Sequence, residues 1–304
     1  MSGRLIVIGV DRSPETSSAL DWVATEARPG DAVQVVHAYS LLPPSAPDPA
    51  LTTRLNRARR EDSQRVVDAA VRFLRDRTAG VTVSGSTLTG APVPVLIGLS
   101  KIADLIVIGG VCAAEAYQHG PGQRIGRWVA TIAACPVVVV PGAHHPSGFT
   151  APVAVLFTGT DVPIEAVEFG FAAAARRRTS VLVTHSWALG ETNEPRTRAE
   201  ILPWEIEEQK GIDQALAGLQ ARYPEVPVVV ALRRVGRYLV SRQLHLTAQL
   251  LVIGRDVRDP AQLSSLTTVA LTLPVCPVAI VPAAYSDPSV LDTVGAISPV
   301  QATP

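Results

Sequence analysis

A few residues in the first half of the chain have the types and spacing needed to hold a small anionic ligand. Asp11 directly follows the apolar run that ends at Val10, and its carboxylate can accept hydrogen bonds from a ribose hydroxyl or an adenine amino group. Gly109 and Gly110 end a second apolar run. Because they carry no side chains, backbone N–H groups there can approach a phosphate closely. We therefore predict a ligand cleft between these two segments.

A third candidate element is the turn that opens a predicted helix at Gly122, Gln123, Arg124 and Ile125. The free N–H groups and the positive end of a helix dipole make a helix N-terminus an anion site. The Arg124 guanidinium could add a charge-assisted hydrogen bond to a phosphate. The competing interpretation of Asp11 is structural, namely that its carboxylate only caps the first helix or the turn before it.

Other site chemistries lack the residues that they need. A P-loop requires Gly-x4-Gly-Lys-Ser/Thr, and neither Lys101 nor Lys210 stands in that pattern. The glycines of 120–126 resemble a dinucleotide fingerprint, but they begin about ten residues beyond the apolar run and no acid follows at the required distance. There is no nucleophile elbow, and His144-His145 offers too few ligands for a metal. We predict no catalytic residue and no metal beyond Mg²⁺ accompanying a nucleotide.

The elements that position these residues are written twice in the chain. Four segments recur in the same order, which indicates a tandem duplication. The matching pairs are Ala19–Trp22 with Ala166–Phe169, Val35–Tyr39 with Val183–Trp187, Asp104–Gly110 with Gln249–Arg255, and Cys135–Pro141 with Cys276–Pro282. We predict a first domain at 1–142, a second, degenerate domain at 150–285 and a loose tail at 286–304.

Each half alternates short apolar runs with helical stretches. Unbroken β-branched runs are typical of strands buried on both faces of a parallel sheet. Ser13, Pro14 and Glu15 predict a helix start with a cap, a proline at the first position and an acid in the first turn. The fold class is therefore α/β, with two tandem doubly wound, Rossmann-like or flavodoxin-like parallel-sheet domains of about five strands each. The first-half strands are expected at Leu5–Val10, Val33–Ala38, Val81–Leu88, Leu105–Ile108 and Val137–Val140.

Composition narrows the partners. Among 304 residues there are 27 Lys+Arg and 27 Asp+Glu, and this zero net charge argues against a general grip on nucleic acid or an anionic membrane. The arginines of the predicted helix 51–77 are best explained as a solvated face, with a nucleic-acid patch as the minor alternative. No apolar run is long enough to span a bilayer, and the N-terminus lacks a signal-peptide pattern. Three cysteines without a CxxC spacing suit a reducing compartment, so we expect a cytoplasmic protein.

Over nearly its whole length the sequence resembles the universal stress protein family in its tandem two-domain form. The marks that carry the resemblance are Ile8–Pro14 with Ala19-Leu20, Val36–Ala38, Gly90–Pro92, Ala103–Gly109 and Cys135–Val140. The resemblance implies that Asp11, Ala38, Gly109 and the Gly122–Ile125 turn line a site for an adenine nucleotide such as ATP. It implies a regulatory protein rather than an enzyme, with at most very slow ATP hydrolysis.

The chain departs from the glycine pattern of the nucleotide-binding members, Gly-x2-Gly-x9-Gly-Ser/Thr. Gly109 and Gly122 fit its first and third glycines, but Cys112 replaces the second and Gln123 replaces the Ser/Thr. In the second half the repeat places Thr158 where Asp11 stands, and Arg255 follows Gly254 with no further glycine. The second half is therefore predicted to bind no nucleotide.

Two functions remain open at this point. In the first, the protein is a sensor whose first half binds ATP or a related adenine nucleotide and so alters its contact with a protein partner. In the second, it is a nucleotide-independent interaction scaffold. The strands at Val137–Val140 and Val278–Val281 would then pair between the halves or between two chains of a homodimer.

Overall fold

The computed structural model describes most of the chain. The described residues are 3–43, 48–110, 122–142, 151–157, 162–187, 197–234, 237–255, 265–272 and 274–283. Within them, each half of the chain contributes five strands.

The first half places its strands in the order β3-β2-β1-β4-β5, all parallel to their neighbours. The order shows that the chain winds outward in one direction from β1 to β3 and then returns to the other side for β4 and β5. Its elements are β1 (Leu5–Gly9), α1 (Glu15–Glu26), β2 (Ala32–Tyr39), α2 (Pro49–Arg75), β3 (Thr82–Thr89), α3 (Pro92–Leu99), β4 (Leu105–Gly110), α4 (Gly122–Ile132) and β5 (Val137–Pro141).

The second half repeats this topology in the order β8-β7-β6-β9-β10. The duplication read from the sequence is therefore also a duplication of strand order. Its elements are β6 (Val153–Phe157), α5 (Ile164–Arg177), β7 (Val181–Ser186), a 3₁₀ turn (Arg198–Glu200), α6 (Ile201–Arg222), β8 (Val228–Arg233), α7 (Arg237–Thr247), β9 (Leu250–Gly254), α8 (Ser265–Thr272) and β10 (Val278–Val281).

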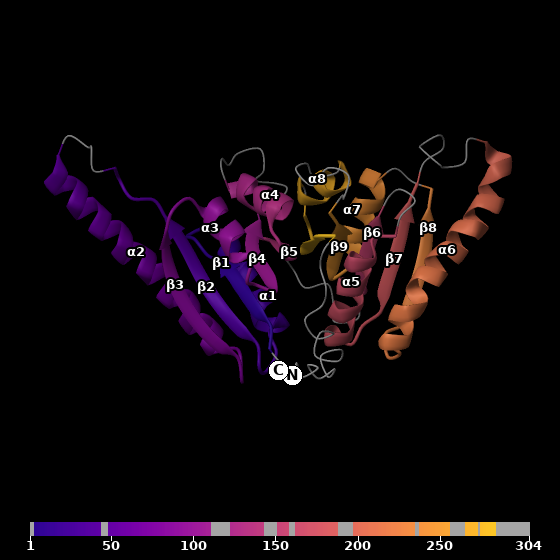
Figure 1. Cartoon of the computed structure of the whole chain (residues 1–304), viewed down its shortest axis with the longest axis horizontal. Helices are drawn as coiled ribbons and strands as arrows, with labels where there is room; N and C mark the ends of the chain where they lie inside the picture. Colours follow the sequence, from indigo (N-terminus) through magenta and orange to yellow (C-terminus); the bar gives the residue numbers. More distant parts are fainter. Residues whose placement is uncertain are drawn as a thin grey trace, which may run out of the picture.

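The two halves share one ten-stranded sheet, because β5 and β10 pair antiparallel at its centre (Figure 1). Val139 lies opposite Val278, and Val137 lies opposite Ile280. The predicted pairing of these strands thus occurs between the halves of one chain. Each of them has neighbours on both sides, so neither offers a free edge to a second chain, and the predicted homodimer through these strands is not supported.

Helices cover both faces of the sheet. On one face lie α1 and α2 of the first half and α5 and α6 of the second, and on the other lie α3, α4, α7 and α8. Because side chains alternate along a strand, Ile6 and Ile8 lie in the first core and Val7 in the second. All three are fully buried, as the unbroken apolar runs predicted.

A buried charge cluster also joins the halves. The carboxylate of Glu26 on α1 is 3% exposed and lies 3.1 Å from Arg176 Nε and 2.6 Å from Arg177 Nη2, both on α5. Arg4 Nη1 approaches the same carboxylate at 3.4 Å. Burial alone would raise the pKa of Glu26, but these guanidinium groups outweigh it and lower the pKa to about 2.

One local prediction differs from the structure. Helix α1 begins at Glu15 with Pro14 at the N-cap and no side-chain cap, so Ser13 does not cap it as predicted. On α4, Val129 is fully buried but Ile132 is 49% exposed, so the buried face of this helix does not extend to Ile132.

Candidate functional site

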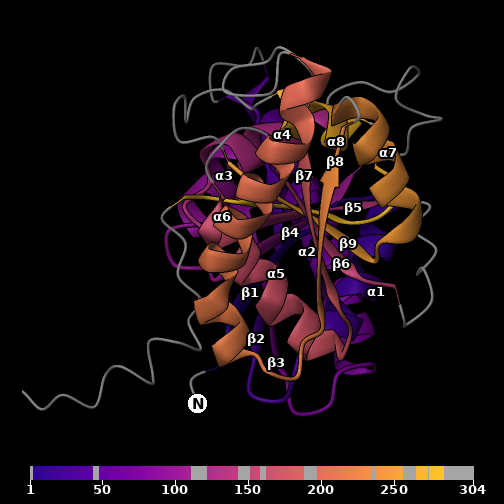
Figure 2. The ribbon, with the colours of Figure 1, turned by 90° about the vertical axis from the view of Figure 1, so that its right-hand side faces the viewer.

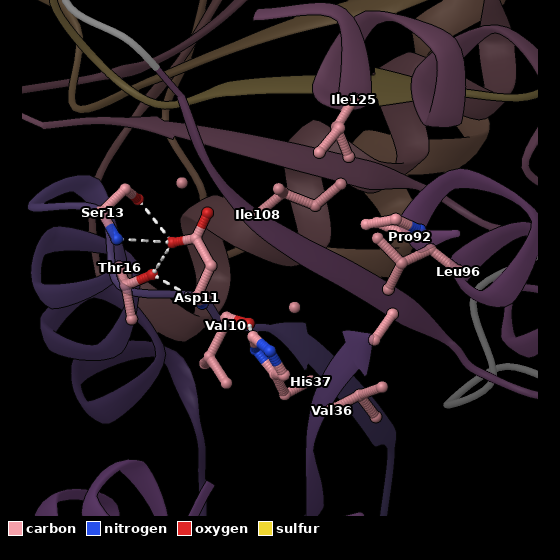
Figure 3. Close-up of a pocket in the computed structure, with 13 residues that line it drawn as sticks. Val10, Asp11, Ser13, Thr16, Val36, His37, Pro92, Leu96, Ile108 and Ile125 are labelled. Carbon is pink, nitrogen blue, oxygen red and sulfur yellow. Dashed lines mark hydrogen bonds between the residues drawn. The ribbon is translucent and has the colours of Figure 1, made fainter. Parts of the chain in front are cut away.

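A pocket opens at the carboxyl ends of β1 and β4, where the winding of the first half reverses (Figure 3). Ligands of open α/β sheets bind at such a switch point because the two loops diverge there. The cavity has a volume of about 70 Å³. A single water molecule needs roughly 10–15 Å³ of cavity volume, so this cavity is large enough for a small ring system. Its lining comprises Gly9, Val10, Asp11, Ser13, Thr16, Val36, His37, Ala38, Pro92, Leu96, Ile108, Gly109 and Ile125.

The Asp11 carboxylate lies at the rim of this pocket and is solvent-exposed. Its Oδ1 accepts hydrogen bonds from Ser13 N at 2.9 Å, Ser13 Oγ at 2.5 Å and Thr16 Oγ1 at 2.7 Å. The structural role considered from the sequence is therefore present, because Asp11 organises the turn before α1. It uses one oxygen only: the described residues donate no hydrogen bond to Oδ2, which points away from Ser13 and Thr16 in Figure 3. Oδ2 can accept a hydrogen bond from a ligand.

His37 and Ala38, at the end of β2, form the adjoining wall. His37 Nδ1 lies 2.8 Å from the carbonyl oxygen of Val10. A carbonyl can only accept, so Nδ1 carries the proton of this bond, and in the neutral ring Nε2 is an acceptor. The bond fixes the orientation of the His37 ring at the pocket wall.

The two glycines after β4 have different surroundings. Gly109 lines the pocket, and a Cβ there would lie 2.8 Å from the backbone carbon of Glu15 at the start of α1. Gly110 is not part of the lining, and its Cβ would lie 2.4 Å from Cγ1 of Val139 on β5. Both positions exclude side chains for reasons of packing alone, so their glycines are not by themselves a sign of a bound phosphate.

The predicted anion turn lies in the first turn of α4, which begins at Gly122. Of its residues, Ile125 reaches the pocket, where it lies beyond Ile108 (Figure 3). The side chains of Gln123 and Arg124 lie outside what the structure describes, as does Cys112. A phosphate contact by this turn therefore stays a prediction.

Several lining residues were not selected as site residues from the sequence. Pro92 and Leu96 come from α3 and form an apolar wall together with Ile108. The Gly90–Pro92 motif was the only signal in the sequence that placed α3 near the site. Ser13 and Thr16 contribute hydroxyl groups, and their hydrogen bonds to Asp11 explain why they follow it so closely.

The strand ends of the second half carry aromatic side chains that pack beside α6. His185, which the repeat pairs with His37, is 1% exposed and stacks on Phe157 with ring centroids 4.7 Å apart. Beside it Trp187 packs against Trp204 of α6, with centroids 4.7 Å apart. Thr158, the counterpart of Asp11, lies outside the described residues. These rings lie on the α6 side of the sheet, whereas Val36, Leu96 and Ile108 of the first-half pocket belong to the core on the opposite face.

The environment of His185 is also chemically different. Burial lowers its pKa to about 4, and burial raises the pKa of the neighbouring Glu208 carboxyl. His185 Nδ1 lies 2.9 Å from Glu208 Oε1 but without the geometry of a hydrogen bond. The ring is therefore neutral at pH 7, and this pair is not an ion pair.

Metal and thiol chemistry find little support in the described residues. No group of three or more His, Cys, Asp or Glu there could hold a metal ion. The thiols of Cys135 and Cys276 are free and buried, and burial raises the pKa of each to about 12. Neither forms the thiolate that reactive cysteines require. His144-His145 and the tail at 286–304 lie outside the described residues. None of the described helices has both the length and the apolar character needed to cross a bilayer.

Comparison with known proteins agrees with this architecture. Residues 4–141 match the model of the universal stress protein family. Universal stress protein Rv2005c of Mycobacterium tuberculosis is 29% identical over 264 residues, which cover 83% of this chain and 87% of the relative. Universal stress protein Rv2623 of the same organism is 28% identical over 268 residues, covering 82% and 85%.

A solved structure of a universal stress protein from Archaeoglobus fulgidus has the same fold. It superposes with a TM-score of 0.64 at 13% identity and covers 92% of this chain and 97% of its own. The similarity extends over both halves, so the tandem arrangement is shared as a fold.

Proposed function

The chain belongs to the universal stress protein family, and on that premise we propose that it is a cytoplasmic regulatory protein whose first half binds an adenine nucleotide such as ATP. The second half is a degenerate copy that binds no nucleotide. Occupancy of the first half would change how the protein meets a protein partner. We assign no catalytic step to the site.

The observation that carries this proposal is the match between the pocket and the two chemical ends of a nucleoside. Leu96, Ile108 and Ile125 offer apolar contact to a flat base, whereas the free oxygen of Asp11 offers an acceptor to a ribose hydroxyl. Ligand pockets combine apolar walls with a few placed polar groups in this manner. The phosphates would extend from the pocket toward Gly109 and the start of α4, with Mg²⁺ accompanying them.

The residues of the second half support the division of labour between the halves. Thr158 stands where the first half has Asp11, and Arg255 follows Gly254 with no further glycine. The second half therefore lacks the carboxylate and the glycines that the first half offers to a nucleotide. One nucleotide per chain is therefore expected.

Isothermal titration calorimetry with ATP, ADP and GTP tests the proposal. Ala38→Leu should abolish ATP binding, because it places a branched side chain in the pocket. Asp11→Asn keeps an acceptor for Ser13 and Thr16 but removes the charge, and should weaken binding about tenfold, or ~1.4 kcal/mol. Thr158→Ala, at the matching position of the second half, is the control and should bind as wild type does.

No heat of binding from wild type at millimolar ATP would refute the proposal. Binding that survives Ala38→Leu would place the nucleotide elsewhere in the chain. A stoichiometry of two nucleotides per chain would contradict the assignment of the second half.

A further inference from the structure

The sheet has two outer strands, and they differ in character although they are copies of each other. Strand β3 reads Thr-Val-Ser-Gly-Ser-Thr-Leu-Thr, whereas β8 reads Val-Val-Val-Ala-Leu-Arg. The registers place Ser84 opposite Gln34 and Val229 opposite Leu182, so the repeat puts Val229 of β8 where Ser84 of β3 stands. Val229 is 54% exposed. The edge of the first half is polar, and that of the second half is apolar.

The free peptide groups of β8 can be identified from its bonds to β7. Val181 N–H donates to Pro227 O at 2.9 Å, and Trp187 N–H donates to Arg233 O at 3.0 Å. Backbone groups alternate sides along a strand, so the odd-numbered residues of β8 face β7. Val228, Val230 and Leu232 therefore direct their N–H and C=O groups to the free edge.

Within the described residues, this edge has none of the usual protection against pairing. Natural edge strands are blunted by proline, by bulges or by lysine pointing into the ladder. Pro227 faces β7 rather than the edge, because its carbonyl accepts from Val181. Figure 2 shows β8 running beside α6 at the side of the molecule that faces the viewer, with no other described strand or helix between it and the viewer.

We propose that β8 is the homodimer interface of this protein and that it pairs antiparallel with β8 of a second copy. A two-fold axis through residue 230 lets Val230 exchange both hydrogen bonds with its counterpart, and it pairs Val228 with Leu232 of the other chain. All free peptide groups of the strand are then satisfied. In this register Val229 lies opposite Ala231 of the second copy, which covers the exposed valine.

Charge favours a second copy as the occupant. Glu225 precedes β8 and Arg233 ends it, and both are exposed. Antiparallel pairing about residue 230 brings Arg233 opposite Pro227 of the other chain, so that Glu225 of that chain is its diagonal neighbour on the same face of the sheet. Opposite charges on neighbouring strands stabilise a pair, and the contact forms twice in the dimer. The same mode of union already joins the two halves, where Val137–Val139 pair antiparallel with Val278–Ile280.

Sedimentation velocity over a range of protein concentrations measures the dimer. Wild type should change from monomer to dimer as concentration rises. Val229→Lys, which places a charge in the new ladder, should raise the dissociation constant at least about tenfold. Ser84→Lys is the matched control on β3 and should leave the dissociation constant unchanged. Val229 is exposed, so the variant should unfold at the same urea concentration as wild type, which separates loss of pairing from loss of fold.

Cross-linking tests the register. In a Cys112→Ala background, Val230→Cys faces its own counterpart across a hydrogen-bonded pair, about 5.5 Å apart between Cα atoms, and that spacing suits a disulfide. Leu232→Cys faces Val228 instead and should not cross-link. A wild type that stays monomeric at every concentration would overturn the proposal, as would a dimer that is unaffected by Val229→Lys. Cross-linking at 232 but not at 230 would overturn the register.

Discussion

Removing the Glu26 carboxylate should weaken the union of the two halves more than any exposed ion pair does. Glu26 belongs to α1, and two of its three arginine partners belong to α5 in the other half. In Glu26→Gln the side chain keeps its size, but Arg177, whose side chain is 12% exposed, loses its counter-charge. Breaking one partner out of a buried pair costs about 3–5 kcal/mol, because the remaining charge is desolvated and unpaired.

The pKa of Glu26 gives an independent estimate of the same quantity. It falls from 4.5 to about 2 on folding, and a shift of that size corresponds to about 3 kcal/mol of stability from the ionised form. Because the folded pKa is lowered, this contribution is complete above pH 4.5 and is lost as the pH falls toward 2. The difference between wild type and Glu26→Gln should therefore be constant from pH 7 to 5 and shrink in more acidic solution.

Urea unfolding followed by circular dichroism measures this difference. Glu207→Gln is the control, because its pair with Lys210 is exposed and should contribute less than about 1 kcal/mol. A Glu26→Gln protein within about 1 kcal/mol of wild type at pH 7 would refute the reasoning. So would a difference that persists unchanged at pH 3.

A change of pH and three substitutions test the packing of the fold. Burial lowers the pKa of His245 and of His185 from 6.5 to about 4. As the pH falls, these histidines therefore take up protons in the unfolded chain before they do so in the folded protein. Urea unfolding should show that the free energy of unfolding falls by ~2 kcal/mol per histidine between pH 7 and pH 5. His245→Gln should remove about half of that loss, and an undiminished loss would contradict the assignment. A Cβ at Gly218 on α6 meets nothing within 4 Å, so Gly218→Ala should gain about 0.5–1 kcal/mol in the same assay. Gly110→Ala should instead lose about 1–3 kcal/mol, because its Cβ would lie 2.4 Å from Val139 Cγ1, and equal effects at the two glycines would contradict the packing.

The strands could be predicted from the sequence because burial on both faces leaves a simple pattern. Leu105–Ile108 and Val137–Val140 were expected as strands, and the structure extends them only to Gly110 and Pro141. The union of the halves into one sheet could only be offered as an alternative, because Val137–Val140 is equally apolar whether it meets β10 or another chain. Which strand it meets depends on the angle between the halves, and no local pattern encodes that angle.

The candidate site could be predicted only in part, because a glycine reports that a side chain is excluded but not what excludes it. Gly109 and Gly110 were interpreted as making room for a phosphate, yet Glu15 and Val139 already account for them. Asp11 was more informative, since a carboxylate has two oxygens and the turn engages only one of them. Polar groups therefore gave a better indication of the site than glycines did.

The duplication extends this reasoning, because each half serves as a reference for the other. The same strand end carries His37 beside an open pocket and His185 beneath Phe157, and the same outer strand carries Ser84 in one half and Val229 in the other. A protein released from binding nucleotide in its second half could carry Thr158 in place of the carboxylate without penalty to the fold. It need not also have made the outer strand apolar, since an exposed apolar edge strand invites pairing with another chain. The loss of ligand-binding residues and the apolar outer strand are both explained if the second half exchanged a ligand site for a surface that binds another chain.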